Sequence, residues 1–281
     1  MRGRGGLVAV GMLLLAGSLL IPPVIAGETS AAPAWRRMET PRYALLSCRS
    51  ERDTRAWAAD FDVFIDALGG LLGTRRTPLR PLTVLLVPDP DARGDLAARR
   101  AMLRDGVRWM TDSPAVTAPL WLETGLAEAF TTFEIRREHV HWGEAMPEHL
   151  ALLRERGLID LHEFLADPQA VRARDPRWFT AQAWALTHLL LVGGPAERRE
   201  HLVAGLRDRR FASTAVFGDP DELQRELEAY LQLKQWPAVI APRSMVERKY
   251  LMTWTTAPAS EPASSRLILP PVPPVLAVTS R

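Results

Sequence analysis

The order of apolar patterns along the chain constrains its fold more than any other feature. Residues 42–48 form an apolar run bounded by charge, residues 51–72 repeat large apolar side chains at helical spacing, and residues 82–87 read LTVLLV. The sequence therefore predicts a strand, a helix and a buried strand, which together make a small mixed sheet with a packed helix. A mostly helical body is expected to follow, so the predicted fold class is α+β.

The helical body is expected between residues 91 and 233. The most apolar helix is predicted at 176–191, and a short extended piece at 140–142 is closed by Gly143. A kink is expected in the first helix, at Gly94 or Gly106. The other predicted helices span residues 91–110, 118–133, 147–156, 158–165, 196–207 and 219–233.

The two ends of the chain predict export and a tail. Two arginines, an apolar run and Pro22–Pro23 precede Ala26, which is typical of a signal peptide over residues 1–26. An uncleaved membrane anchor is the alternative. We expect a linker at 27–40, one domain at 41–243 and a disordered Pro/Ala/Ser-rich tail at 244–281. The protein is then periplasmic or extracellular, and it meets a membrane only through an uncleaved N-terminal segment.

The charge balance argues against a nucleic-acid-binding protein, and the cysteine content excludes an internal disulfide. The 281 residues include 35 basic and 33 acidic side chains, for a formal net charge of +2. This balance is not typical of a nucleic-acid-binding protein. Cys48 is the only cysteine, so an internal disulfide is excluded.

One stretch carries a specific resemblance. Residues 119–130 read PLWLETGLAEAF, which is similar to the PLWLNEGLAEYF pattern of the peptidase-MA-like group of exported bacterial proteins. That group is built on a gluzincin-type metallopeptidase domain. Residues 43–72, 81–87, 147–154 and 178–191 resemble further stretches of the same family, so the resemblance covers most of residues 41–233.

The resemblance also implies a zinc site, and this chain departs from it. In the family, two histidines one helical turn apart and the glutamate of the following EG pair bind zinc, and the glutamate after the first histidine activates water. Arg104 and Arg108 stand at the histidine positions, Asp105 at the general base and Thr124 at the third ligand. A register one residue later puts Asp105 and Trp109 at the ligand positions instead. The family's tyrosine, a hydrogen-bond donor, is matched by Thr180.

These substitutions predict a protein without zinc chemistry. Arginine has no lone pair for a metal and stays cationic, so no zinc or other cofactor is expected. A non-catalytic pseudo-peptidase with a binding or scaffold role is therefore the leading interpretation. Its partner is unidentified, with a peptide or protein of the cell envelope as the expected class. The expected ligand-binding cleft contains Arg104, Arg108, Glu123 and Glu128.

Several alternatives remain open. The cleft is either an arginine–carboxylate cluster in place of zinc, with Asp105 and Asp112 also in reach of Arg108, or a basic pocket for a carboxylate or peptide C-terminus. An active metallopeptidase or other hydrolase with non-standard ligands is a second reading. Its metal ligands are His139 and His141, with Glu144 or Glu128 as the third. The third interpretation is a structural envelope protein that contacts its partner through the tail. His149 and His188 are expected to be packed and hydrogen-bonded.

Overall fold

A computed structural model describes residues 35–73, 82–86, 96–112, 118–208, 218–246, 257–258 and 267–269. All of these residues belong to one unit of packing, Ala34–Arg281. The expected signal peptide and most of the expected tail lie outside the described residues. Within the described ranges, no helix has both the length and the apolar character that crossing a bilayer demands.

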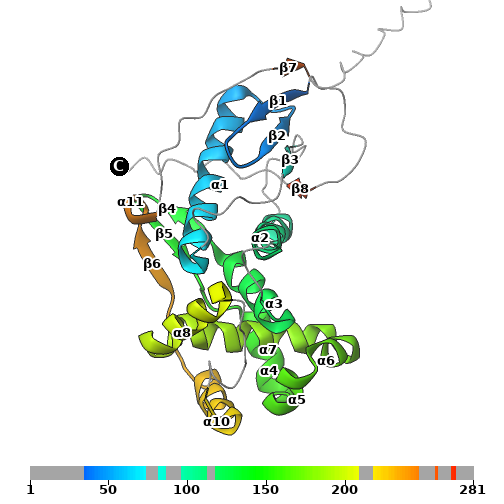
Figure 1. The fold of residues 1–281 in the computed structure, drawn as a ribbon, viewed down its shortest axis with the longest axis vertical. Coiled ribbons are helices and arrows are strands. Elements are labelled where there is room, and N and C mark those ends of the chain that lie inside the picture. The colour runs from blue at the N-terminus through cyan, green and yellow to red at the C-terminus, as the bar shows by residue number, and fades with distance from the viewer. Residues whose placement is uncertain are drawn as a thin grey trace, which may run out of the picture. The chain divides into compact units, whose positions relative to one another are not determined.

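The first sheet is mixed, and α1 (Glu51–Leu72) runs alongside it (Figure 1). Strand β1 (Arg36–Glu39) is antiparallel to β2 (Ala44–Ser47), and the chain passes through α1 before β3 (Thr83–Leu86) pairs in parallel with β2. Two short strands complete the order β7-β1-β2-β3-β8. They are β7 (Ala257–Pro258), antiparallel to β1, and β8 (Leu267–Leu269), parallel to β3. The strand, helix and strand predicted from the sequence are all present, and the α+β class is confirmed.

Helix α1 has the bounds that the sequence predicted because both of its ends are capped. The Ser50 side chain accepts a hydrogen bond from an amide of the first turn, and Gly73 ends the helix with a φ of 68°. Its buried face carries three aromatic rings. The centroids of Trp57 and Phe61 are 4.8 Å apart, and those of Phe61 and Phe64 are 5.7 Å apart. These rings belong to the hydrophobic core.

The helical body starts at α2, and several of its helices begin with the same device. An aspartate side chain accepts hydrogen bonds from first-turn amides at the start of α5, α6, α7 and α10, and a proline follows it in the last three. The elements are α2 (Leu96–Thr111), α3 (Leu120–Ala129), η1 (Phe130–Thr132), α4 (Pro147–Arg156), α5 (Leu161–Ala166), α6 (Pro168–Arg174), α7 (Pro176–His188), the π-helical η2 (Leu189–Gly193), α8 (Ala196–Asp208), α10 (Pro220–Leu231) and α11 (Arg243–Val246).

A second sheet is antiparallel and has the order β4-β5-β6. Strand β4 (Glu134–Arg136) turns through Arg137, whose φ is 54°, into β5 (His139–Trp142). Strand β6 (Val239–Pro242) then pairs with β5 from about a hundred residues further along the chain. The sequence predicted only the β5 segment as extended, so this sheet is an addition to the expected fold.

The structure differs from the sequence prediction in four places. Strand β1 lies inside the expected linker, where its pairing with β2 orders it. Helix α2 continues through Gly106 without a break, because the glycine there serves packing: a Cβ would lie 2.7 Å from the Phe64 ring. Gly94 lies outside the described residues. Helix α6 was missed, and β7 and β8 pair within the expected tail.

Helices α3 and α7 pack closely at Gly125, the glycine of the GLAE stretch. A Cβ on Gly125 would lie 2.0 Å from Thr187 Oγ1 and 2.2 Å from the Ala183 carbonyl oxygen. A backbone oxygen inside a helix cannot move aside without breaking a hydrogen bond. The absence of a side chain at Gly125 therefore sets the distance between the two helices.

Gly125→Ala and Gly106→Ala form a matched pair that tests this packing. Both exchanges add one methyl group inside a helix, but Gly125→Ala meets backbone and Gly106→Ala meets the tip of a ring. We expect Gly125→Ala to lower the free energy of unfolding by about 3 kcal/mol and Gly106→Ala by about 1 kcal/mol. Urea unfolding followed by circular dichroism measures both values. Equal losses would contradict the account.

Candidate functional site

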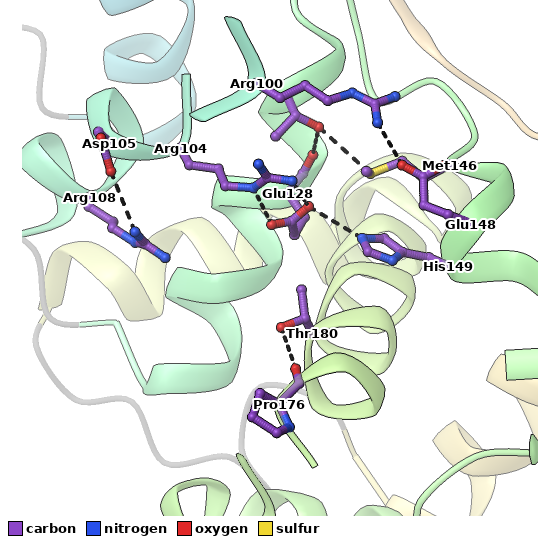
Figure 2. A network of polar contacts seen from close by, with 11 residues as sticks. Arg100, Arg104, Asp105, Arg108, Glu128, Met146, Glu148, His149, Pro176 and Thr180 are labelled. Carbon is purple, nitrogen blue, oxygen red and sulfur yellow. Dashed lines mark hydrogen bonds and ion pairs between the residues drawn. The ribbon is translucent and has the colours of Figure 1, made fainter. Parts of the chain in front are cut away.

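Three arginines stand one turn apart along α2: Arg100, Arg104 and Arg108. Residues at this spacing share one face of a helix. In the structure each of the three forms an ion pair, and each uses a different carboxylate. Figure 2 shows the three pairs together. The row of arginines is therefore neutralised locally rather than gathered into one positive pocket.

The Arg104 pair crosses from α2 to α3 and joins two residues that the sequence named. Arg104 Nε donates to Glu128 Oε1 at 2.5 Å, and Arg104 Nη2 donates to Glu128 Oε2 at 2.8 Å (Figure 2). Two parallel N–H bonds to one carboxylate make a bidentate pair, which is stronger than a single contact. The Glu128 side chain is only 7% exposed, and that of Arg104 is 28% exposed.

His149 on α4 completes the cluster. Its Nε2 lies 3.3 Å from Glu128 Oε2, and because a carboxylate only accepts, Nε2 carries the proton. The His149 ring also packs beside Trp184, with centroids 5.4 Å apart. The prediction of a packed, hydrogen-bonded His149 is confirmed. Its place beside Glu128 was missed, because no sequence spacing relates the two positions.

The environment of Glu128 favours its charged form. Burial by itself raises the pKa of this carboxyl, but hydrogen bonds from His149 and Arg104 and the positive charge of Arg104 outweigh burial. The resulting pKa is about 2, compared with an ordinary value of 4.5. The same hydrogen bond raises the pKa of Arg104. Glu128 and Arg104 are therefore a fixed ion pair over the whole physiological range.

Arg100 and Arg108 lie outside this cluster. Arg108 Nη1 contacts Asp105 Oδ1 on its own helix at 3.4 Å, and both side chains are more than 40% exposed. Arg100 Nη1 reaches Glu148 Oε1 on α4 at 2.6 Å. The expected cleft of Arg104, Arg108, Glu123 and Glu128 is thus only partly assembled. Arg104 and Glu128 meet, while Arg108 pairs elsewhere and the Glu123 side chain takes no part in the ion pairs of the arginine row.

The order of contacts shows that α2 and α3 run antiparallel. Arg99 Nη2 donates to the Phe133 carbonyl oxygen at 3.0 Å, whereas Arg104, further along α2, meets Glu128, which lies earlier in the chain. Arg104 is therefore the residue of the arginine row that faces α3.

The two threonines of the altered motif are engaged by their own helices. Thr124 Oγ1 donates to the Leu120 carbonyl oxygen at 2.8 Å, and Thr180 Oγ1 donates to that of Pro176 at 2.7 Å. A guanidinium has no lone pair for a metal, and a neutral hydroxyl is a poor replacement for a carboxylate. The donor set at positions 104, 108 and 124 does not fit zinc.

The alternative metal site on β5 has its carboxylates occupied. His139 and His141 stand on one face of the strand, but Glu144 pairs with Arg136 at 2.9 Å and Glu128 pairs with Arg104. In the part of the chain that the structure describes, no three His, Cys, Asp or Glu side chains gather closely enough to hold a metal ion.

Searches for similar proteins returned nothing: no protein-family model, no curated protein and no solved structure matches this chain. What the site can do is therefore decided by its own chemistry. Its described parts are a buried carboxylate, a guanidinium and an imidazole, brought together from three helices. Such a cluster cross-links helices.

Stability should depend on Glu128 with a defined sign. Its folded pKa lies below the ordinary value, so the ionised carboxyl stabilises the fold above about pH 4.5, and this stabilisation is lost as the pH falls toward 2. The difference corresponds to about 3 kcal/mol. We expect Glu128→Gln to be less stable than the native chain at pH 6 and equally stable near pH 2.

Urea unfolding at a series of pH values measures this effect. The exposed glutamate Glu155, also on the helical body, supplies the control. Glu155→Gln should follow the native pH profile, because its carboxylate is exposed. A Glu128→Gln profile parallel to the native one would show that the ion pair contributes nothing.

Proposed function

We propose that this chain is an exported, non-catalytic protein with a binding or scaffold role, built on a gluzincin-like domain that has lost its zinc. The single observation that carries the proposal is the bidentate pair between Arg104 and Glu128. A guanidinium at this position delivers a fixed positive charge between α2 and α3. In the family that the sequence resembles, a metal dication supplies the positive charge between these helices.

The contacts favour one of the two interpretations of the cleft. A basic pocket for a carboxylate ligand needs a net positive charge, but Glu128 neutralises Arg104 by accepting from both its Nε and its Nη2. Arg108 is half-exposed and contacts Asp105 at its own surface. An arginine–carboxylate cluster in place of zinc is the interpretation that these distances support.

Export and partner class follow from the sequence. The charged start, apolar run and Pro22–Pro23 of the N-terminal segment support a signal peptide or an anchor. Because no hydrolytic site is assembled among the described residues, association is the proposed mode of action, with a peptide or protein of the cell envelope as the proposed partner. The alternatives of an active hydrolase and of a structural envelope protein become outcomes of the experiments below.

Metal analysis tests the proposal directly. Protein expressed without a tag in zinc-supplemented medium is expected to contain well below one equivalent of zinc by elemental analysis. It should not cleave a mixed peptide library, with or without a chelator. One equivalent of zinc together with chelator-sensitive cleavage would establish a metallopeptidase instead. His139→Ala and His141→Ala then show whether β5 supplies the ligands.

Restoring the ligands tests the gluzincin-like geometry itself. The triple variant Arg104→His, Arg108→His and Thr124→Glu returns the donor set of the resembled family to the three positions that the resemblance assigns to it. We expect it to bind about one equivalent of zinc with four-coordinate geometry. The double variant that keeps Thr124 is the matched control and should bind more weakly. Equal and weak binding by both variants would contradict the assigned positions.

A further inference from the structure

A pocket of about 350 Å³ lies between η2 and α10, away from the arginine row. This volume is at the small end of the range for ligand pockets, roughly 300–1,000 Å³. Two glycines of η2 and its C-terminal boundary, Gly193 and Gly194, form part of the wall, and Arg198, Glu226 and Tyr230 supply its polar groups. The remaining wall is apolar and comes from Leu189, Pro195, Ala229 and Leu233.

The Tyr230 hydroxyl can only accept a hydrogen bond from a ligand, because its own hydrogen is donated to His188. His188 is fully buried, and its Nε2 lies 2.6 Å from the Gly143 carbonyl oxygen, so Nε2 carries a hydrogen. Burial lowers the pKa of His188 to about 4, although the bond to Gly143 raises it, so the ring is neutral and its Nδ1 is an acceptor. Tyr230 therefore donates to Nδ1 at 2.8 Å.

Tyr230 lines the pocket together with Gly193. In the described part of the chain, its hydroxyl has no hydrogen-bond partner other than His188. The ring lies against η2 so closely that a Cβ on Gly193 would be 2.3 Å from the hydroxyl oxygen. Gly193 thus makes room for a polar group on the wall of a mostly apolar pocket. Tyr230 is positioned as an acceptor for a ligand N–H.

An accessible ion pair provides the second polar feature. Arg198 on α8 bonds to Glu226 on α10 through both terminal nitrogens, with Nη2 donating to Oε1 at 3.2 Å. The two side chains are 21% and 46% exposed, so both retain contact with solvent. A purely anionic ligand is repelled by the carboxylate, and a purely cationic ligand is repelled by the guanidinium. A ligand with both charges next to each other complements the pair.

We propose that this pocket binds a free amino acid with an apolar side chain. The ligand carboxylate accepts from Arg198, its ammonium donates to Glu226 and to the Tyr230 oxygen, and its side chain packs on the apolar wall. Each charged group of the zwitterion then has a partner of opposite sign. The side chain supplies the burial that a small ligand needs.

Calorimetric titration of the native chain with L-leucine and three analogues tests the proposal. Leucinamide lacks the carboxylate, 4-methylpentanoate lacks the ammonium, and glycine lacks the side chain. Saturable binding of L-leucine with one site is expected, and each analogue should bind at least about tenfold more weakly, because it loses one charge-assisted bond or its apolar contact. No heat of binding up to about 10 mM L-leucine, or equal binding by any analogue, overturns the proposal.

Variants locate the site. Arg198→Gln should weaken L-leucine binding about tenfold, and Tyr230→Phe should also weaken it, while Arg199→Gln on the same helix should leave it unchanged. Tryptophan fluorescence gives a second readout, since the Trp236 ring is 4.5 Å from that of Tyr230. Binding that survives Arg198→Gln unaltered places the ligand elsewhere and overturns the assignment. If that variant does not fold, the analogue series on the native chain still decides the question.

Discussion

The buried carboxylate of Glu128 is the constraint on which the arrangement of α2, α3 and α4 depends. A charge that is 7% exposed is costly to remove from water unless its oxygens are paired. Arg104 fills two acceptor sites with its planar fork, and His149 fills a third. One side chain on α3 thereby fixes one residue on α2 and one on α4. Removing Arg104 leaves the buried carboxylate paired only with His149, and removing Glu128 leaves both donors without this acceptor.

The same pairing bears on the proposal that a guanidinium stands where the resembled family carries zinc. A metal dication holds helices together by drawing lone pairs from several of them. The guanidinium inverts the direction of the bonds, because it donates where a metal accepts. In this chain the carboxylate of Glu128 accepts from Arg104, and the hydroxyl of Thr124 donates to its own backbone at Leu120.

The sequence predicted what depends on local pattern. Helix α1 was found residue for residue because its large apolar side chains repeat at helical spacing, and in the structure Ser50 and Gly73 cap it at those bounds. Helix α6 was missed although Asp167 and Pro168 carry the same start signal as Asp219 and Pro220, since only seven residues follow before the next aspartate. Strands β1 and β6 are short and have little apolar pattern of their own. Their partners order them, and no local reading contains those partners.

The same limit applies to the candidate site, where local spacing predicts some neighbours but not the contacts between helices. Helical spacing put Asp105 and Asp112 within reach of Arg108. Glu123 or Glu128 was expected to reach across from the following helix, but the sequence did not decide which pairs form. That decision needs the antiparallel approach of α3, which turns Glu128 toward Arg104, and the approach of α4, which brings His149. Tertiary contacts between residues 21 to 24 positions apart leave no trace in spacing.

Two histidines beside Trp184 show how partners rather than residue type set the chemistry. The ring centroids of His149 and His188 lie 5.4 Å and 5.6 Å from that of Trp184. His149 donates to a carboxylate and so belongs to a charged cluster. His188 lies between a carbonyl and a phenol, and burial keeps it neutral, so it orients a hydroxyl proton without adding charge. The same aromatic core therefore supports a fixed ion pair on one side and a polarised, uncharged acceptor on the other.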